Sequence, residues 1–381
     1  PEEVAVQEAG AGGNPFRISQ PDVAHFPYAT WARLVARHAR HSLPGVSLYQ
    51  HAHGYVPLRE AIAAHIGLTR GVQCAPDQII VTAGSQGALA LVAHVLLDPG
   101  DPVWLEDPGY TGARGALLAA GAMLIPVPVD HEGLDVAAGR QLCPHARLAV
   151  VTPSHQFPTC VTMSLRRRLA LLEWARRADA WIVEDDYDSE YRFGGRPLEA
   201  LHGLADEGRV LYVGTFSKVL FPSLRLGYLV APPDLLPAVR AARRFSDIHR
   251  PILEQMALAD FIAEGHFARY LRRMRPLYQA RRDALVEALR QDLGDLLDIV
   301  VPQAGLNLAA WLPAGLCGRA VAGPIADHGL VLPALSQFSL RPLERDGWLF
   351  GFAGASPDTL RAGVRALAHI VRGRVHPLPA P

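Results

Sequence analysis

The sequence has little of what marks secreted, membrane-spanning or nucleic-acid-binding proteins. Its 381 residues include only four cysteines, none at zinc-ligand spacing, so we expect reduced thiols in a cytoplasmic protein rather than disulfides. The longest strongly apolar stretch, residues 88–97, is too short for the roughly 20 residues of a membrane span. No signal peptide is visible. Lys plus Arg total 37, as do Asp plus Glu, so net charge attracts neither nucleic acid nor anionic lipid.

The residues that are abundant describe a well-buried protein. Half of them are hydrophobic and 19% are charged, and the length suggests two or three lobes. Residues 1–15 are rich in Ala, Gly and Glu without periodicity, which predicts a linker. His51 and His53 form an HxH pair that lacks a third ligand, so we expect no metal site.

The hydrophobic pattern predicts an α/β protein with a mostly parallel sheet. Short apolar runs alternate with helical segments between residues 49 and 240, as in a large domain whose sheet is covered by helices on both faces. The expected strands are residues 78–82, 102–106, 123–127, 147–152, 180–184, 209–213 and 227–231. Residues 241–381 continue with long arginine-rich helices and form a smaller α+β domain, against which residues 16–48 should pack. We interpret these arginines as solvated faces or interdomain contacts rather than a nucleic-acid stripe.

The segment VGTFSKVLFPSLRLGY, residues 213–228, places Lys218 among apolar residues after a predicted strand. Desolvation there would lower the pKa of the lysine and favour the nucleophilic amine. Alone, the pattern also fits a lysine that extends to solvent. Thr215 and Ser217 add hydroxyls, and Arg225 adds a fork suited to phosphate. Together these residues suggest a binding site for a phosphorylated aldehyde.

Acidic residues follow another buried strand in WIVEDDYDSEY, residues 181–191. Ligands of α/β sheets bind at such strand ends. The Asp185 carboxylate could keep a pyridine nitrogen protonated while the Tyr187 phenol bonds a ring oxygen. A solvated acidic turn or a Mg²⁺ site is the alternative.

A third segment, VTAGSQGAL at residues 81–89, reads as a strand, a small-residue turn and the start of a helix. The backbone N–H groups of Ser85 and Gln86 would point at an anion, aided by the helix dipole. The segment matches neither a dinucleotide-binding nor a Walker motif.

These segments, in this order, resemble those of fold-type I pyridoxal-phosphate (PLP) enzymes of aminotransferase class I/II. The resemblance spans nearly the whole chain and is most specific for the MocR/GabR-type regulators of the GntR family, in which an aminotransferase-like domain follows a winged-helix DNA-binding domain. The motifs that carry it further are YQHAHGYVPLR (49–59), EDPGYTGAR (106–114), TPSHQFPT (152–159) and EDDYDSEYRFGGRPLEAL (184–201).

The resemblance implies a role for each candidate residue. Lys218 would form the internal aldimine with PLP and later move a proton, while Asp185 would pair with the pyridinium nitrogen. Tyr187 would bond the ring hydroxyl, and Tyr110 would stack on the ring face. The groups that would hold the phosphate are Ser85, Gln86, Thr215, Ser217 and Arg225, joined by Tyr49 from the neighbouring subunit of a homodimer.

Three positions depart from the enzymes of this family. Phe157 stands where an Asn bonds the ring oxygen, so Gln156 or His155 would have to substitute, and Cys160 replaces a Gly. Leu349 stands where an arginine grips the substrate α-carboxylate, which argues against ordinary amino-acid transamination.

Two functions remain open. The first is the effector-binding domain of a MocR-type regulator, sensing an amine or amino acid and contacting DNA only through a winged helix attached before residue 1. The second is a stand-alone PLP-dependent aminotransferase or related PLP enzyme.

Overall fold

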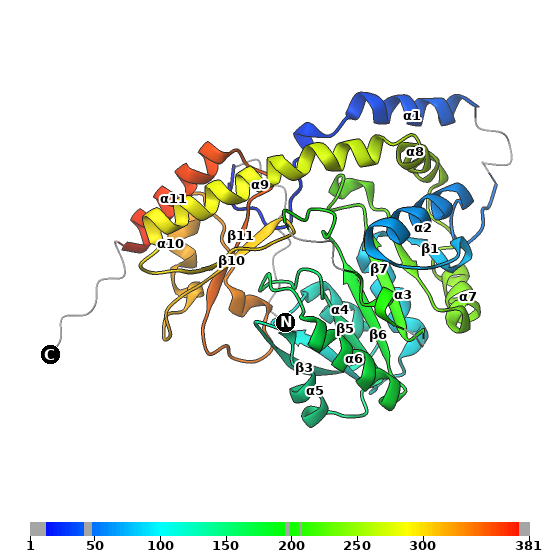
Figure 1. Cartoon of the computed structure of the whole chain (residues 1–381), viewed down its shortest axis with the longest axis horizontal. Coiled ribbons are helices and arrows are strands. Elements are labelled where there is room, and N and C mark those ends of the chain that lie inside the picture. Colours follow the sequence, from blue (N-terminus) through cyan, green and yellow to red (C-terminus); the bar gives the residue numbers. More distant parts are fainter. Residues whose placement is uncertain (1–12, 42–47, 195–198, 206–207, 373–381) are drawn as a thin grey trace.

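A long helix, α9 (His266–Leu293), runs from the large domain, at the right of Figure 1, across the small domain at the left. The computed structural model describes residues 13–41, 48–194, 199–205 and 208–372, so most of the predicted linker, residues 1–12, lies outside the described residues. Among the described residues, no helix is both long and apolar enough to cross a membrane.

The large domain is built on an eight-stranded sheet of order β1-β8-β7-β6-β5-β2-β3-β4. The five strands from β7 to β3 pair in parallel, and antiparallel pairs lie at both ends. The strands are β1 (Ile79–Thr82), β2 (Pro102–Asp107), β3 (Met123–Asp130), β4 (Gly133–Leu134), β5 (Leu148–Val151), β6 (Trp181–Asp186), β7 (Val210–Thr215) and β8 (Gly227–Val230). The predicted mostly parallel sheet is confirmed.

Helices cover both faces of this sheet because successive strand residues point to opposite sides. Val103 and Leu105 pack into a cluster with α3 and α4, whereas Trp104 points to the other face and stacks on Trp174 of α6 at 3.7 Å. The helices are α2 (Val56–Arg70), α3 (Gly84–Leu96), α4 (Thr111–Ala119), α5 (Val136–Leu142), α6 (Leu165–Ala178) and α7 (Leu236–Ser246). Burial on both faces explains why the strands read as continuous apolar runs.

The small domain contains a three-stranded antiparallel sheet of order β11-β10-β9. Its strands are β9 (Asp298–Val300), β10 (Asn307–Trp311) and β11 (Gly347–Gly351). Helices α10 (Ala322–Asp327) and α11 (Pro357–Arg372) belong to the same α+β unit, and α8 (Ile252–Ala263) precedes α9. Helix α1 (Tyr28–His41) was not predicted and lies beside α8 (Figure 1).

Arginines of α9 bond within the chain. Arg281 forms a buried ion pair with Asp22 at 2.6 Å, and Arg282 donates to the Pro302 carbonyl at 2.9 Å. Arg275 donates to the Glu190 carbonyl at 2.7 Å. These three arginines are therefore used in contacts within the chain, and that of Arg275 reaches the large domain, which favours structural contacts over a nucleic-acid stripe.

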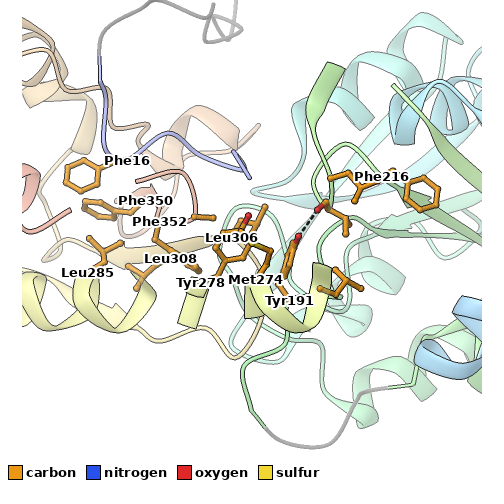
Figure 2. Packing of buried hydrophobic residues seen from close by; sticks show 14 of the residues in the cluster. Phe16, Tyr191, Phe216, Met274, Tyr278, Leu285, Leu306, Leu308, Phe350 and Phe352 are labelled. Atoms are coloured by element: carbon orange, nitrogen blue, oxygen red, sulfur yellow. Dashed lines mark hydrogen bonds between the residues drawn. The ribbon is translucent and has the colours of Figure 1, made fainter. Parts of the chain in front are cut away.

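One apolar cluster extends through both domains (Figure 2). Phe16 packs edge-on against Phe350 of the small domain, with ring centroids 5.1 Å apart. Tyr191 packs against Tyr278 of α9 at 4.7 Å and donates from Oη to the Val219 carbonyl at 2.6 Å, the dashed line in Figure 2. This bond fixes the backbone next to Lys218.

Candidate active site

A cavity of about 460 Å³ gathers most of the predicted site residues. Those that line it are Ser85, Gln86, Tyr110, Asp185, Tyr187 and Lys218. The lining also includes seven residues that were not predicted to contact a ligand: Ile18, Ser19, Thr111, Gly112, Thr152, Phe157 and Phe338.

Lys218 follows β7 on a segment whose next two residues, Val219 and Leu220, are fully buried. Burial lowers the pKa of Lys218 from its ordinary value, although the Asp188 and Asp185 carboxylates oppose the shift. A lowered pKa makes the neutral, nucleophilic amine more accessible near neutral pH.

Asp185 lies near the end of β6, where only 4% of the residue is exposed. Its Oδ1 has no hydrogen-bond partner among the described residues. Burial, then the carboxylates of Asp186, Glu106 and Asp188, raises the pKa of Asp185 to about 7, with Lys218 acting in the opposite direction. A buried carboxyl with a bare oxygen is suited to a ligand that brings an N–H donor or a positive charge.

An anion cradle surrounds Gly84, the first residue of α3. A Cβ built on Gly84 would lie 3.6 Å from Thr215 Oγ1 and 3.7 Å from both Ser217 Oγ and Arg225 Nη1. The Ser217 hydroxyl is buried and has no partner among the described residues. The first N–H groups of a helix lack intrahelical acceptors, and α3 has no side-chain cap. Hydroxyls, a guanidinium and free N–H groups therefore converge on one point, as a phosphate requires.

Tyr110 and Gln86 are connected across the cavity wall. Tyr110 Oη donates to Gln86 Oε1 at 3.4 Å, and Gln86 Nε2 donates to the Gly112 carbonyl at 2.9 Å. The side chain of Gln86 is thus held by the start of α4, so its backbone N–H is the group left for an anion.

Tyr49 lies outside the cavity of its own chain. It is 83% exposed, and its ring centroid is 6.2 Å from that of His249. Its predicted phosphate contact therefore depends on a second subunit.

The residues around Phe157 show how the predicted substitutes for the missing Asn are used. Gln156 Nε2 donates to Glu106 and to the carbonyls of Pro108 and Phe157, at 2.7–3.1 Å, so its amide is occupied by the protein. His155 does not line the cavity but contacts the Tyr187 hydroxyl at 3.2 Å.

Leu349 is fully buried in an apolar cluster with Phe157, Tyr187 and Phe338. Among the described residues that line the cavity, Lys218 is the one with a cationic side chain. The wall near Leu349 is thus apolar rather than suited to a carboxylate.

Ser19 reaches the cavity from the N-terminal segment, which no local motif predicted. Its backbone N–H donates to Asn307 Oδ1 at 2.6 Å, and Asn307 Nδ2 donates to its hydroxyl at 3.0 Å. Because the two positions lie 288 residues apart, only the folded chain shows this contact.

Comparison with solved structures defines the class of protein. An archaeal alanine:glyoxylate aminotransferase superposes with a TM-score of 0.89 and 29% identity, covering 97% of this chain and 93% of the other. The α-aminoadipate aminotransferase of Thermus thermophilus, complexed with N-(5'-phosphopyridoxyl)-L-leucine, gives 0.86 and 31%, covering 94% and 92%. The fold is therefore that of the fold-type I PLP-dependent aminotransferases.

Sequence comparison identifies the family. The profile described as aminotransferase class I and II matches residues 17–367. The probable rhizopine catabolism regulatory protein MocR of Rhizobium meliloti is 44% identical over 92% of this chain and 71% of its own length. This chain belongs to the aminotransferase class I and II family, and the predicted similarity to MocR-type regulators is confirmed.

Proposed function

We propose that this chain binds PLP in the cavity and that the loaded site recognises an amine or amino acid, as the effector-binding domain of a MocR-type transcriptional regulator. The observation that carries the proposal is the match between three parts of one cavity and three parts of one cofactor. The lysine amine suits the aldehyde, the unpartnered Asp185 oxygen suits the pyridine nitrogen, and the cradle at Gly84 suits the phosphate.

Each residue has a defined task in this proposal. Lys218 would hold the cofactor covalently through its amine, and Asp185 would keep a proton on the ring nitrogen. Tyr187 would donate to the ring oxygen, and Tyr110 would cover the ring face. The phosphate would be held by the N–H groups of Ser85 and Gln86 and the side chains of Thr215, Ser217 and Arg225. When bound, PLP supplies an electrophilic carbon for amines and an electron sink.

The regulatory role is supported by the identity with MocR, a regulatory protein of which this chain covers 71%. In a regulator, DNA contacts would belong to a winged helix, and binding of the amine would be passed to it through the relative position of the two domains. Tyr49 would complete the phosphate site across a homodimer, which is consistent with its 83% exposure in the single chain.

A stand-alone aminotransferase is the second candidate, supported by the similarity to aminotransferases and by the lowered pKa of Lys218. A lysine that can shed its proton can also move one during catalysis. Both candidates use the same cofactor site and differ in whether the bound amine is released as product.

The test is an absorbance spectrum of the purified protein with added PLP, compared with the Lys218→Ala variant. We expect a visible cofactor band in the wild type that is absent from the variant. A wild type that takes up no PLP would refute the proposal. With a panel of amines and amino acids, a stable spectral change without released carbonyl product favours the regulator, whereas sustained product formation favours the enzyme.

A further inference from the structure

His155, Asp188 and Tyr187 form a buried hydrogen-bonded group behind the cavity. His155 Nδ1 lies 3.2 and 3.1 Å from the two Asp188 carboxylate oxygens and 3.2 Å from Tyr187 Oη. All three residues are at least nine-tenths buried. One ring nitrogen therefore faces three oxygen atoms of two different side chains.

The location of the proton on this nitrogen follows from what each neighbour can do. An ionised carboxylate only accepts hydrogen bonds, and Asp188 already accepts from the Leu306 N–H at 3.1 Å. Burial lowers the pKa of His155, but Asp188 and Cys160 outweigh burial and raise it to about 10. His155 Nδ1 therefore carries a hydrogen and cannot accept one from Tyr187. The pKa of the Tyr187 phenol is raised by burial and by nearby acidic groups, so its hydroxyl stays protonated.

We infer that His155 and Asp188 are positioning residues that make Tyr187 a hydrogen-bond donor into the cavity, toward the ring oxygen of the bound cofactor. This inference rests on the proposed function. It explains how the site operates with Phe157 on the cavity wall and with the Gln156 amide used elsewhere. The Thr152 hydroxyl, another cavity residue, donates to Glu106 at 2.6 Å, so it is not free to donate to the ring oxygen.

The small domain encloses this group through Gly305. A Cβ on Gly305, whose φ is +86°, would lie 2.1 Å from His155 Nδ1 and 2.6 Å from Asp188 Oδ2. The backbone there must be glycine because any side chain would displace the pair. The other titratable groups that act on His155 or Tyr187 are Cys160, Asp185 and Glu106.

The test is a pH titration of the absorbance of the PLP-loaded protein, which reports the pKa of the nitrogen that joins Lys218 to the cofactor. A hydrogen bond from Tyr187 stabilises the ring oxygen most when the nitrogen has lost its proton, because the oxygen then shares no proton with the nitrogen. Loss of the bond therefore raises the pKa of the nitrogen. We expect Tyr187→Phe to raise it by about one unit, a tenfold change in the dissociation constant. His155→Leu should raise it by at least about half a unit and should add nothing in the Tyr187→Phe background.

Asp188→Asn tests the proton assignment without removing the histidine. With its oxygen held by the Leu306 N–H, the amide introduced by this substitution no longer accepts the hydrogen of His155 Nδ1. Nδ1 then presents one lone pair, and the Tyr187 hydroxyl competes with the amide NH₂ to donate to it. The cofactor pKa should again rise. His65→Leu, which removes a histidine packed on Phe267 of α9, is the matched control and should change nothing.

The outcomes separate this inference from the proposed function. If wild-type protein shows no PLP band, the proposed function fails. If the band is present but His155→Leu and Asp188→Asn leave the pKa unchanged, or their shifts persist fully in the Tyr187→Phe background, the positioning role is refuted. Should His155→Leu not fold, the Asp188→Asn result decides.

Discussion

Replacing Gly84 with Ala should separate the stability of this protein from its affinity for phosphate. Gly84 has a φ of +75°, a conformation that side chains rarely adopt, and it is the point on which Thr215, Ser217 and Arg225 converge. Gly329 offers a matched control, since its φ is +74° and a Cβ there would meet nothing within 4 Å.

The backbone penalty should be equal at the two positions. A left-handed conformation costs a non-glycine residue about 1 kcal/mol, so both alanine variants should lose that much stability. Only at Gly84 would the methyl group lie 3.6–3.7 Å from the three phosphate-binding side chains. A phosphate oxygen needs to lie within about 3 Å of the same atoms, so the methyl group and the phosphate compete for one space. Losing one charge-assisted hydrogen bond, about 1.5–3 kcal/mol, corresponds to roughly a 10- to 100-fold weaker affinity.

The assay is calorimetric titration with pyridoxine 5'-phosphate, which has no aldehyde and therefore reports binding without the bond to Lys218. Urea unfolding of both variants measures the shared stability loss. The reasoning is refuted if Gly84→Ala binds as tightly as the wild type, or if Gly329→Ala loses as much affinity.

Three further predictions follow from buried charges and from the dimer. Asp185→Asn should stabilise the cofactor-free protein above pH 7, because the pKa of the buried Asp185 carboxyl is raised to about 7 and its ionisation therefore opposes folding. The gain in stability should shrink below pH 7 and vanish below pH 4, where the carboxyl is protonated in both the folded and the unfolded forms. Urea unfolding at several pH values would measure this. Arg70→Met should destabilise the chain by about 3–5 kcal/mol, since it leaves Asp186 buried without the 2.7 Å ion pair; an unchanged urea midpoint would contradict this. Tyr49→Ala should weaken PLP binding in a dimer, although Tyr49 lies outside its own chain's cavity. A mixed dimer of one Tyr49→Ala chain and one Lys218→Ala chain should regain one intact site, and the absorbance per dimer would measure it.

Much of the fold could be predicted because the sheet strands are buried on both faces and therefore read as continuous apolar runs. Each of the seven predicted strands of the large domain corresponds to a strand of the structure. Helix α1 was not predicted although Trp31, Leu34 and Val35 follow helical spacing and belong to or pack on the apolar cluster. The signal is short, because most of the other residues of the helix are polar or small. The two-residue strand β4 was missed because so short a segment has no periodicity.

The site residues could be predicted where several of them lie in one short segment of the sequence. Lys218, Thr215, Ser217 and Arg225 lie within eleven residues, and Asp185 and Tyr187 are two apart, so the motif and the site largely coincide. Ser19 was not predictable, since its place in the cavity depends on Asn307 at the other end of the chain.

The sequence by itself determined the class of fold, the family and the residues suited to a phosphorylated aldehyde, because these depend on hydrophobic period and on side chains close along the chain. Tertiary structure alone decided how the site is tuned. The unpartnered oxygen of Asp185, the convergence on Gly84 and the proton held between His155 and Asp188 all arise where separate strands end at one edge of a sheet and the small domain closes over them. Burial and hydrogen-bond partners set pKa values and proton positions, and neither is written in the local sequence.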